Sequence, residues 1–211
     1  MAAAMPNLRH QMDEAIGSQC ATLLARGHVD NLRWHHGLWW WCDPDGVSMY
    51  TWPGPQGIAP VKPARTRLPD RAAALAHSIA VSPDGRTLYF SDAVTHRIMQ
   101  CDYDAPAAKA ANIRLFADVP HAQPRGVVVD ADGCLWSAHF GAGKVVCYGP
   151  DGRQLRSIAL PAEYPTQPAF GGPQRDQLLV GAMPQPGVAG GLYQFDSGGA
   201  RGLPDTLFND Q

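Results

Sequence analysis

A pattern that recurs about every 45 residues constrains this chain more than any other feature. Four segments, at 35–43, 82–92, 130–140 and 172–182, each combine a turn signal, a leucine and a short apolar strand. The shared leucines are Leu38, Leu88, Leu135 and Leu178. Repeats of this length built from short strands are typical of propeller blades. The sequence therefore predicts an all-β fold, a β-propeller of about four blades.

The strands inside two of the units follow from their alternation of apolar runs and turns. An Asp-Gly turn at 84–85 separates the first two strands of the second unit, because glycine tolerates the positive φ of a tight hairpin. We expect strands at 79–81, 88–91, 97–103 and 113–116 in this unit, and at 127–129, 134–138, 144–148 and 155–160 in the next.

Two stretches fall outside the repeat. Residues 53–70 are rich in proline and are interpreted as a linker. Residues 8–26 have apolar side chains at near-helical spacing, and they form either a short helix or a strand that closes the ring. We therefore expect an N-terminal segment over 1–26 and a single propeller domain over 27–211.

Composition argues against several classes of protein. The formal net charge is −2 with no block of like charge, so no nucleic-acid partner is expected. There is no apolar run of roughly 18 residues and no signal-peptide pattern, so we expect no membrane association and a cytoplasmic location. The five cysteines are odd in number and none forms a Cys-x-x-Cys pair, which favours buried reduced thiols over disulfides or a zinc site.

Residues 78–104, 124–152 and 165–182 resemble the family that holds senescence marker protein (regucalcin), gluconolactonase and luciferin-regenerating enzyme. The resemblance begins at His77 and continues almost unbroken to about Pro204, and residues 32–52 are similar to the first blade. It implies a propeller of the six-bladed lactonase type. It also implies hydrolysis of sugar lactones at a divalent metal, calcium or zinc, in the central channel.

The chain departs from the family at the metal ligands. His77 replaces an asparagine that precedes the Ser-Pro-Asp turn, and Arg125 replaces the aspartate of a Pro-Asp-Gly triplet, which is a ligand and a catalytic base. At the glutamate of a Glu-Gly-Pro triplet we align Arg26-Gly27-His28. A further asparagine belongs to a blade with no counterpart here. About two of six blades, each of roughly 45 residues, are missing between Trp52 and His77.

These replacements change the chemistry expected at the channel mouth. An arginine offers only donors and a permanent positive charge, so it repels a cation and suits an anion. We expect the substrate to contact His77, Arg125, His121 and Gln167, with Thr166 as an alternative to Gln167 in the fourth unit. Arg125 stands at the catalytic position, and His77 is the one candidate metal ligand.

Two functions follow, and the sequence leaves both open. The first is a sugar-lactone hydrolase of the gluconolactonase type with an altered metal site. The second is a non-catalytic propeller whose basic channel binds an anionic ligand or a partner, and a shortened chain without function is a third reading. The expected ligands are a sugar lactone or sugar acid. A ring of four blades either closes or leaves open edges, which a homo-oligomer can cover.

Overall fold

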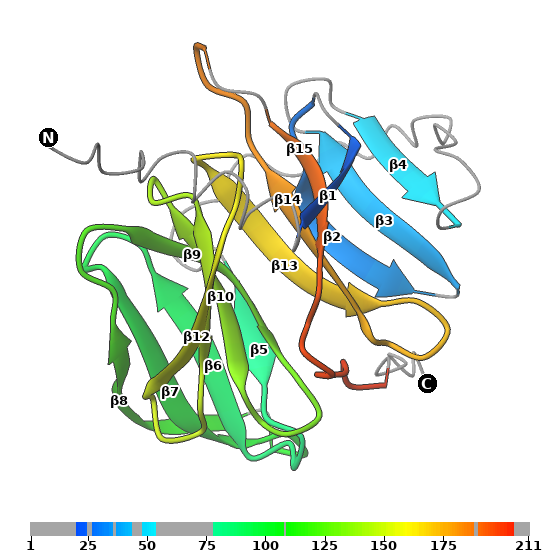
Figure 1. Ribbon diagram of the computed structural model, residues 1–211. Helices are drawn as coiled ribbons and strands as arrows, with labels where there is room; N and C mark the ends of the chain where they lie inside the picture. The colour runs from blue at the N-terminus through cyan, green and yellow to red at the C-terminus, as the bar shows by residue number, and fades with distance from the viewer. Residues whose placement is uncertain are drawn as a thin grey trace, which may run out of the picture.

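The computed structural model describes residues 20–24, 27–35, 37–43, 48–53, 78–107, 109–187 and 190–204. Every regular element in these residues is a β-strand, and the strands form antiparallel sheets (Figure 1). The described part of the chain contains no helix long and apolar enough to cross a membrane. The predicted all-β propeller architecture is confirmed.

Four sheets form the blades, and each begins with an inner strand. The first contains β2 (Asp30–His35), β3 (Leu38–Asp43) and β4 (Ser48–Trp52). The second contains β5 (Ile79–Val81), β6 (Thr87–Asp92), β7 (Arg97–Asp104) and β8 (Lys109–Asp118). The third contains β9 (Gln123–Val129), β10 (Leu135–Phe140), β11 (Lys144–Tyr148) and β12 (Gln154–Ala159). The fourth contains β13 (Pro165–Gly171), β14 (Gln177–Ala182), β15 (Gly191–Phe195) and β1 (Cys20–Leu24). The strands predicted for the second and third units all form, within a few residues of the expected bounds.

The strand β1 comes first in the chain but belongs to the last blade. It pairs antiparallel with β15, and Cys20 lies opposite Phe195. The strand alternative for residues 8–26 is therefore correct over 20–24, while residues 8–19 lie outside the described part. The N-terminal segment and the propeller domain share a sheet, and the boundary at residue 27 stays a prediction.

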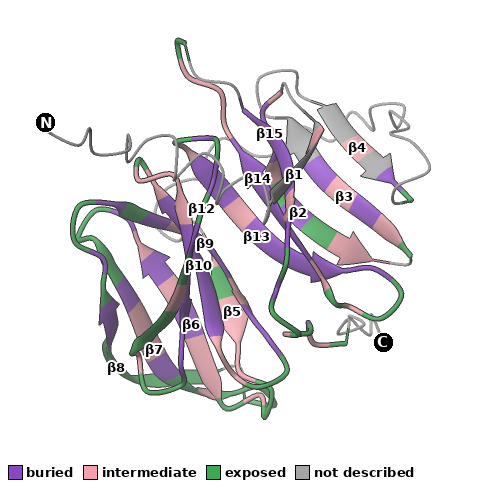
Figure 2. Ribbon diagram, in the orientation of Figure 1, coloured by how far each residue is buried: buried purple, intermediate pink, exposed green. Residues whose placement is uncertain are grey.

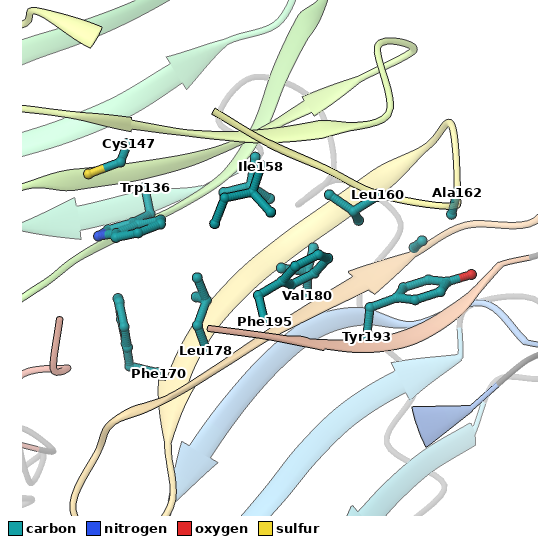
Figure 3. Close-up of a cluster of buried hydrophobic side chains, with 12 residues drawn as sticks. Trp136, Cys147, Ile158, Leu160, Ala162, Phe170, Leu178, Val180, Tyr193 and Phe195 are labelled. Atoms are coloured by element: carbon teal, nitrogen blue, oxygen red, sulfur yellow. The ribbon is translucent and has the colours of Figure 1, made fainter. Parts of the chain in front are cut away.

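The blades form an open arc. Their inner strands pack in the order β5, β9, β13, β2, so the chain's first blade follows its last (Figure 1). An apolar cluster fills each of the three interfaces between neighbouring blades, and Figure 3 shows the one between the third and fourth. Among the described residues no such cluster joins β5 to β2. Most of the predicted linker at 53–70 lies outside the described residues.

The first blade corrects one detail of the repeat. Trp39, and not Leu38, pairs with Trp34, the residue that corresponds to the partners of Leu135 and Leu178, and the Trp39 side chain is fully buried. The reason is a shorter hairpin, in which His35 pairs with Leu38 across two residues. Gly171 of the fourth blade makes room for the indole, since a Cβ there would lie 2.6 Å from the Trp39 ring.

One face of the second blade is apolar, and no other blade in the described part of the chain packs against it. A row of paired residues crosses all four of its strands, namely Ile79, Phe90, Met99 and Leu115. Ile79 is 58% exposed and Leu115 is 44% exposed. The opposite face packs against the third blade. Figure 2 shows the contrast between the partly exposed β5–β8 and the almost continuously buried β10 and β14.

His139 of β10 is buried in the wall between blades, not exposed to the channel. Its Nε2 lies 3.1 Å from the hydroxyl of Tyr148, and the ring is 4% exposed. Burial, assisted by the positive charge of Lys144, lowers the pKa of His139 from 6.5 to about 4. The imidazole is therefore neutral at physiological pH.

We predict that Trp39→Ala destabilises the fold by about 3–5 kcal/mol, because it leaves a cavity between the first and fourth blades. The matched control is Leu38→Ala, whose side chain is partly exposed in the same strand. Its cost should be about 1 kcal/mol or less. Urea denaturation measures both values. Equal destabilisation by the two variants would contradict the register described above.

A second prediction concerns acid stability. The folded pKa of His139 lies below its unfolded value, so stability is complete above pH 6.5 and is lost as the pH falls towards 4. The full loss is about 3 kcal/mol, at 1.36 kcal/mol for each pKa unit. In the variant His139→Phe the unfolding free energy should decline less between pH 7 and pH 5. Parallel slopes in the two proteins would show that His139 titrates normally.

Candidate functional site

The inner strands β2, β9 and β13 each carry an extra residue near their start. On β9, Val127 and Pro124 pair with residues only two apart on β10, Ser137 and His139. The same irregularity occurs between Arg33 and Asp30 on β2, and between Gln167 and Pro165 on β13. Bulges of this kind turn a side chain out of the regular alternation and are frequent beside active sites. Three neighbouring bulges therefore mark one end of the arc as the candidate site.

Three residues occupy the same place in these bulged strands: Asp30, Arg125 and Thr166. Each stands four residues before a side chain that packs between blades, respectively Trp34, Val129 and Phe170. By the same count the second blade contributes His77, which lies outside the described residues. The first described residue there is Ser78, which directly precedes β5. The register thus assigns Thr166, and not Gln167, as the equivalent of Arg125.

Asp30 is a candidate that the sequence analysis missed. We aligned Arg26 with the family's glutamate, but Arg26 lies outside the described residues, and the strand register places Asp30 at this position. The partly buried carboxylate accepts a 2.8 Å hydrogen bond from the backbone N–H of Asn31, which adopts a positive φ of 51°. The available signal was Trp34, which follows a Glu-Gly-Pro triplet in the family. Asn31, which stands where the family has glycine, hid this correspondence.

Arg125 is held against an aromatic ring. Its guanidinium carbon lies 4.6 Å from the centre of the Phe140 ring, and that ring lies 5.0 Å from Tyr164. Such cation–π contacts stabilise by about 0.5–2 kcal/mol and leave the N–H groups free to bind an anion. The carbonyl of Arg125 also accepts a hydrogen bond from the Ser91 hydroxyl of the second blade. The ring contact orients the guanidinium, and the hydrogen bond holds the backbone near the start of β9 against the second blade.

Gln167 braces the inner strands. Its Nε2 donates to the carbonyls of Val127 (3.2 Å) and Pro168 (3.0 Å), and its Oε1 accepts from the Ser78 hydroxyl at 3.3 Å. These contacts tie together the second, third and fourth blades. Because the amide is already engaged, its role as a substrate ligand stays a prediction.

Thr166 and Gly126 permit the same close approach. The Thr166 hydroxyl donates to the carbonyl of Val29, which connects the fourth blade to the first. At Gly126 a Cβ would lie 2.5 Å from Oε1 of Gln167, so no larger residue fits without displacement. The strand starts are thereby held side by side.

His121 lies apart from these contacts. It is exposed in the loop between β8 and β9, and its backbone has a positive φ of 67°. Its contact with substrate stays a prediction, as does that of His77.

The described donors at this end do not fit a calcium ion. Calcium requires six to eight oxygen ligands, with carboxylates among them. Asp30 supplies one carboxylate, Thr166 supplies one hydroxyl, and Arg125 supplies only donors and a positive charge. In the described chain, three metal-ligating side chains gather only around Asp130, at the opposite end of β9. At the candidate site itself, the permanent positive charge of Arg125 favours an anion over a cation.

The comparisons with known proteins agree with the fold. A family model described as SMP-30/Gluconolactonase/LRE-like region matches residues 56–183. L-arabinolactonase from Azospirillum brasilense is 44% identical over 105 residues, which are 49% of this chain and 35% of that protein. Regucalcin from Xenopus laevis is 30% identical over 142 residues, which are 60% of this chain and 46% of that protein. The chain spans about a third to a half of the length of these relatives.

The solved structures lead to the same family. A regucalcin from Agrobacterium tumefaciens, described as a calcium-binding protein, superposes with a TM-score of 0.60 at 25% identity. The alignment covers 86% of this chain and 64% of that one. Luciferin-regenerating enzyme superposes with a TM-score of 0.58 at 22% identity, over 83% of this chain and 63% of that one, which supports the fold alone. The chain belongs to the SMP-30/gluconolactonase/LRE-like family.

Proposed function

We propose that the bulged strand starts bind a sugar lactone and hydrolyse it to the sugar acid without a metal ion. The observation that carries the proposal is the guanidinium of Arg125, held over Phe140 at the position of the family's aspartate. The relatives of this chain include proteins named L-arabinolactonase and 6-deoxy-6-sulfogluconolactonase. A fixed cation at this place attracts the carbonyl oxygen of a lactone and the carboxylate of its product.

The proposed reaction needs a base and an anion-stabilising group. Asp30 accepts a proton from water as the water oxygen bonds to the lactone carbonyl carbon. Negative charge develops on the carbonyl oxygen, where Arg125 stabilises it. The tetrahedral intermediate then expels the ring oxygen, which takes the proton back from Asp30 and becomes a hydroxyl. The product is the open-chain hydroxy acid, and its carboxylate remains paired with Arg125 until release.

Non-catalytic binding of a sugar acid is the second candidate. It rests on the same arginine, because a carboxylate ligand requires a cation but no base. A planar guanidinium binds a carboxylate through two parallel hydrogen bonds, which a lysine does not reproduce. The two functions differ in the role of Asp30, so one set of variants separates them.

The test uses two assays. Hydrolysis of gluconolactone is measured by the release of acid, and binding of gluconate is measured by calorimetry. Arg125→Ala should lower kcat/KM by about 10²–10³ and weaken gluconate binding, while Arg125→Lys should restore only part of both. Asp30→Asn should lower kcat by about 10²–10⁴ and leave gluconate binding intact. A chelator should change neither measurement. Chelator-sensitive turnover would contradict the metal-free site, whereas gluconate binding without turnover would leave the second candidate.

We also propose that the chain self-associates through the exposed face of the second blade. The row from Ile79 to Leu115 contains no charged side chain, so two copies can bury it against each other around a two-fold axis. The connection over 54–77 has far fewer residues than the roughly 90 needed for two further blades. A second copy is therefore the occupant that we favour.

Sedimentation at increasing concentration tests this association. Ile79→Asp should shift the wild-type dimer to monomer, because it places a charge in the paired faces. Leu155→Asp is the matched control, since Leu155 is 63% exposed on β12 and lies in another blade. A wild-type protein that stays monomeric, or a control that dissociates equally, would rule out this face.

A further inference from the structure

A second cluster of reactive side chains lies at the other end of the third blade. It consists of Asp130, which follows β9, Cys134, which precedes β10, and Cys147 in β11. Their carboxylate oxygen and two sulfur atoms all lie within 4.8 Å of one another. The cysteine spacing in the sequence gave no sign of a metal site. The hairpin of β10 and β11 brings the thiols together, since Trp136 pairs with Cys147.

The carboxylate of Asp130 is buried and fixed in orientation. Asp130 is only 2% exposed. Oδ1 accepts hydrogen bonds from the backbone N–H groups of Asp132 (3.1 Å) and Cys134 (2.8 Å), and Oδ2 accepts one from Nε1 of Trp136 at 2.8 Å. An ionised carboxylate offers about four lone-pair directions, so one remains on Oδ2. Hydrogen bonds of this kind also orient ligating carboxylates in metal sites.

The two thiols complete a negative, sulfur-rich pocket. Cys147 is buried beside Trp136 (Figure 3), whereas Cys134 is partly exposed and opens the cluster to solvent. Burial, with the nearby sulfur of Cys134 and the charge of Asp130, raises the pKa of Cys147 to about 12. Burial and the same carboxylate raise the pKa of Cys134. A bound cation would replace the thiol protons, because cysteine ligates a metal ion as the thiolate.

We propose that Asp130, Cys134 and Cys147 bind a thiophilic divalent cation of the zinc or cadmium class. Tetrahedral zinc holds sulfur at about 2.3 Å and carboxylate oxygen at about 2.0–2.2 Å, so its ligands lie roughly 3.5 Å apart. Small side-chain rotations bring three atoms that are already within 4.8 Å to this spacing. Water reaches the fourth position past Cys134. Two sulfur ligands select against calcium and magnesium, which prefer oxygen.

The site is separate from the proposed lactonase site. Arg125 lies near the start of β9 and Asp130 follows its end, so the two sites occupy opposite ends of one strand. A metal here therefore has no contact with the proposed hydrolysis. Its expected effect is to join β9, β10 and β11 at the hairpin end of the blade.

The experiment is a titration of the full chain with cadmium in the presence of a phosphine reductant. Binding is measured by the ultraviolet absorption band of charge transfer from thiolate to cadmium. The background carries Cys20→Ser, Cys42→Ser and Cys101→Ser, so only the proposed pair contributes thiols. We expect one equivalent of cadmium per chain, displaced by zinc, and a rise in Tm upon binding. Cys134→Ser should abolish the absorption. Asp130→Asn should weaken binding by about tenfold or more.

Two outcomes would overturn the proposal. One is the absence of a saturable charge-transfer band in a background protein that circular dichroism shows to be folded. The other is a band that survives Cys134→Ser. Cys134 is partly exposed at the start of a hairpin, so its serine variant should fold even where Cys147→Ser does not.

Discussion

The close approach of the inner strands is the constraint on which the remaining structure depends. Gly126 of β9 lies against Gln167 of β13, with no space for a Cβ. Where strands meet this tightly, backbone carbonyls lose access to water and need partners from the next blade. Ser78, Gln167 and Thr166 supply those partners. The same residues hold the bulges in place, so packing of the blades and placement of the candidate site have one cause.

Among the described residues, this arrangement is interrupted at one place only, between the second blade and the first. The four blades present are neighbours around the ring, because the first follows the fourth through β2 and β13. Three interfaces therefore keep their apolar clusters. Apolar surface stays exposed to water on the outer face of the second blade, above all along the row that contains Phe90 and Met99. An apolar sheet face without a partner is an association risk in any soluble protein.

Much of the fold could be predicted because the repeat carries its own turns. Asp-Gly turns and alternating apolar residues located the strands of the second and third blades. Two features needed three-dimensional information. The shortened hairpin after His35 moved the core position from Leu38 to Trp39, and pairing of β1 with β15 joins segments from opposite ends of the chain. Neither follows from local periodicity.

The candidate site was less accessible to prediction. The substitution at Arg125 was visible in the sequence because Pro124 and Gly126 of the Pro-Asp-Gly triplet are kept around it. Packing requires Gly126, since a Cβ there would collide with Gln167. Asp30 was hidden because its neighbour is Asn31, which replaces glycine at a positive φ and breaks the motif. The contact between Arg125 and Phe140 joins different strands, and it depends on a bulge that no local pattern encodes.

The pairing of β1 with β15 also governs how the chain reaches its folded state. Cys20 precedes its partner Phe195 by 175 residues in the chain, so this pairing forms only after the intervening blades have been synthesised. The first three blades can form from contiguous segments, whereas the fourth must wait for a contact between distant parts of the chain. Such non-local contacts carry a large loop-closure entropy and slow folding. Until β1 pairs with it, β15 is an unpaired edge strand. Pairing with residues 20–24 then competes with pairing to another chain, which leads to aggregation.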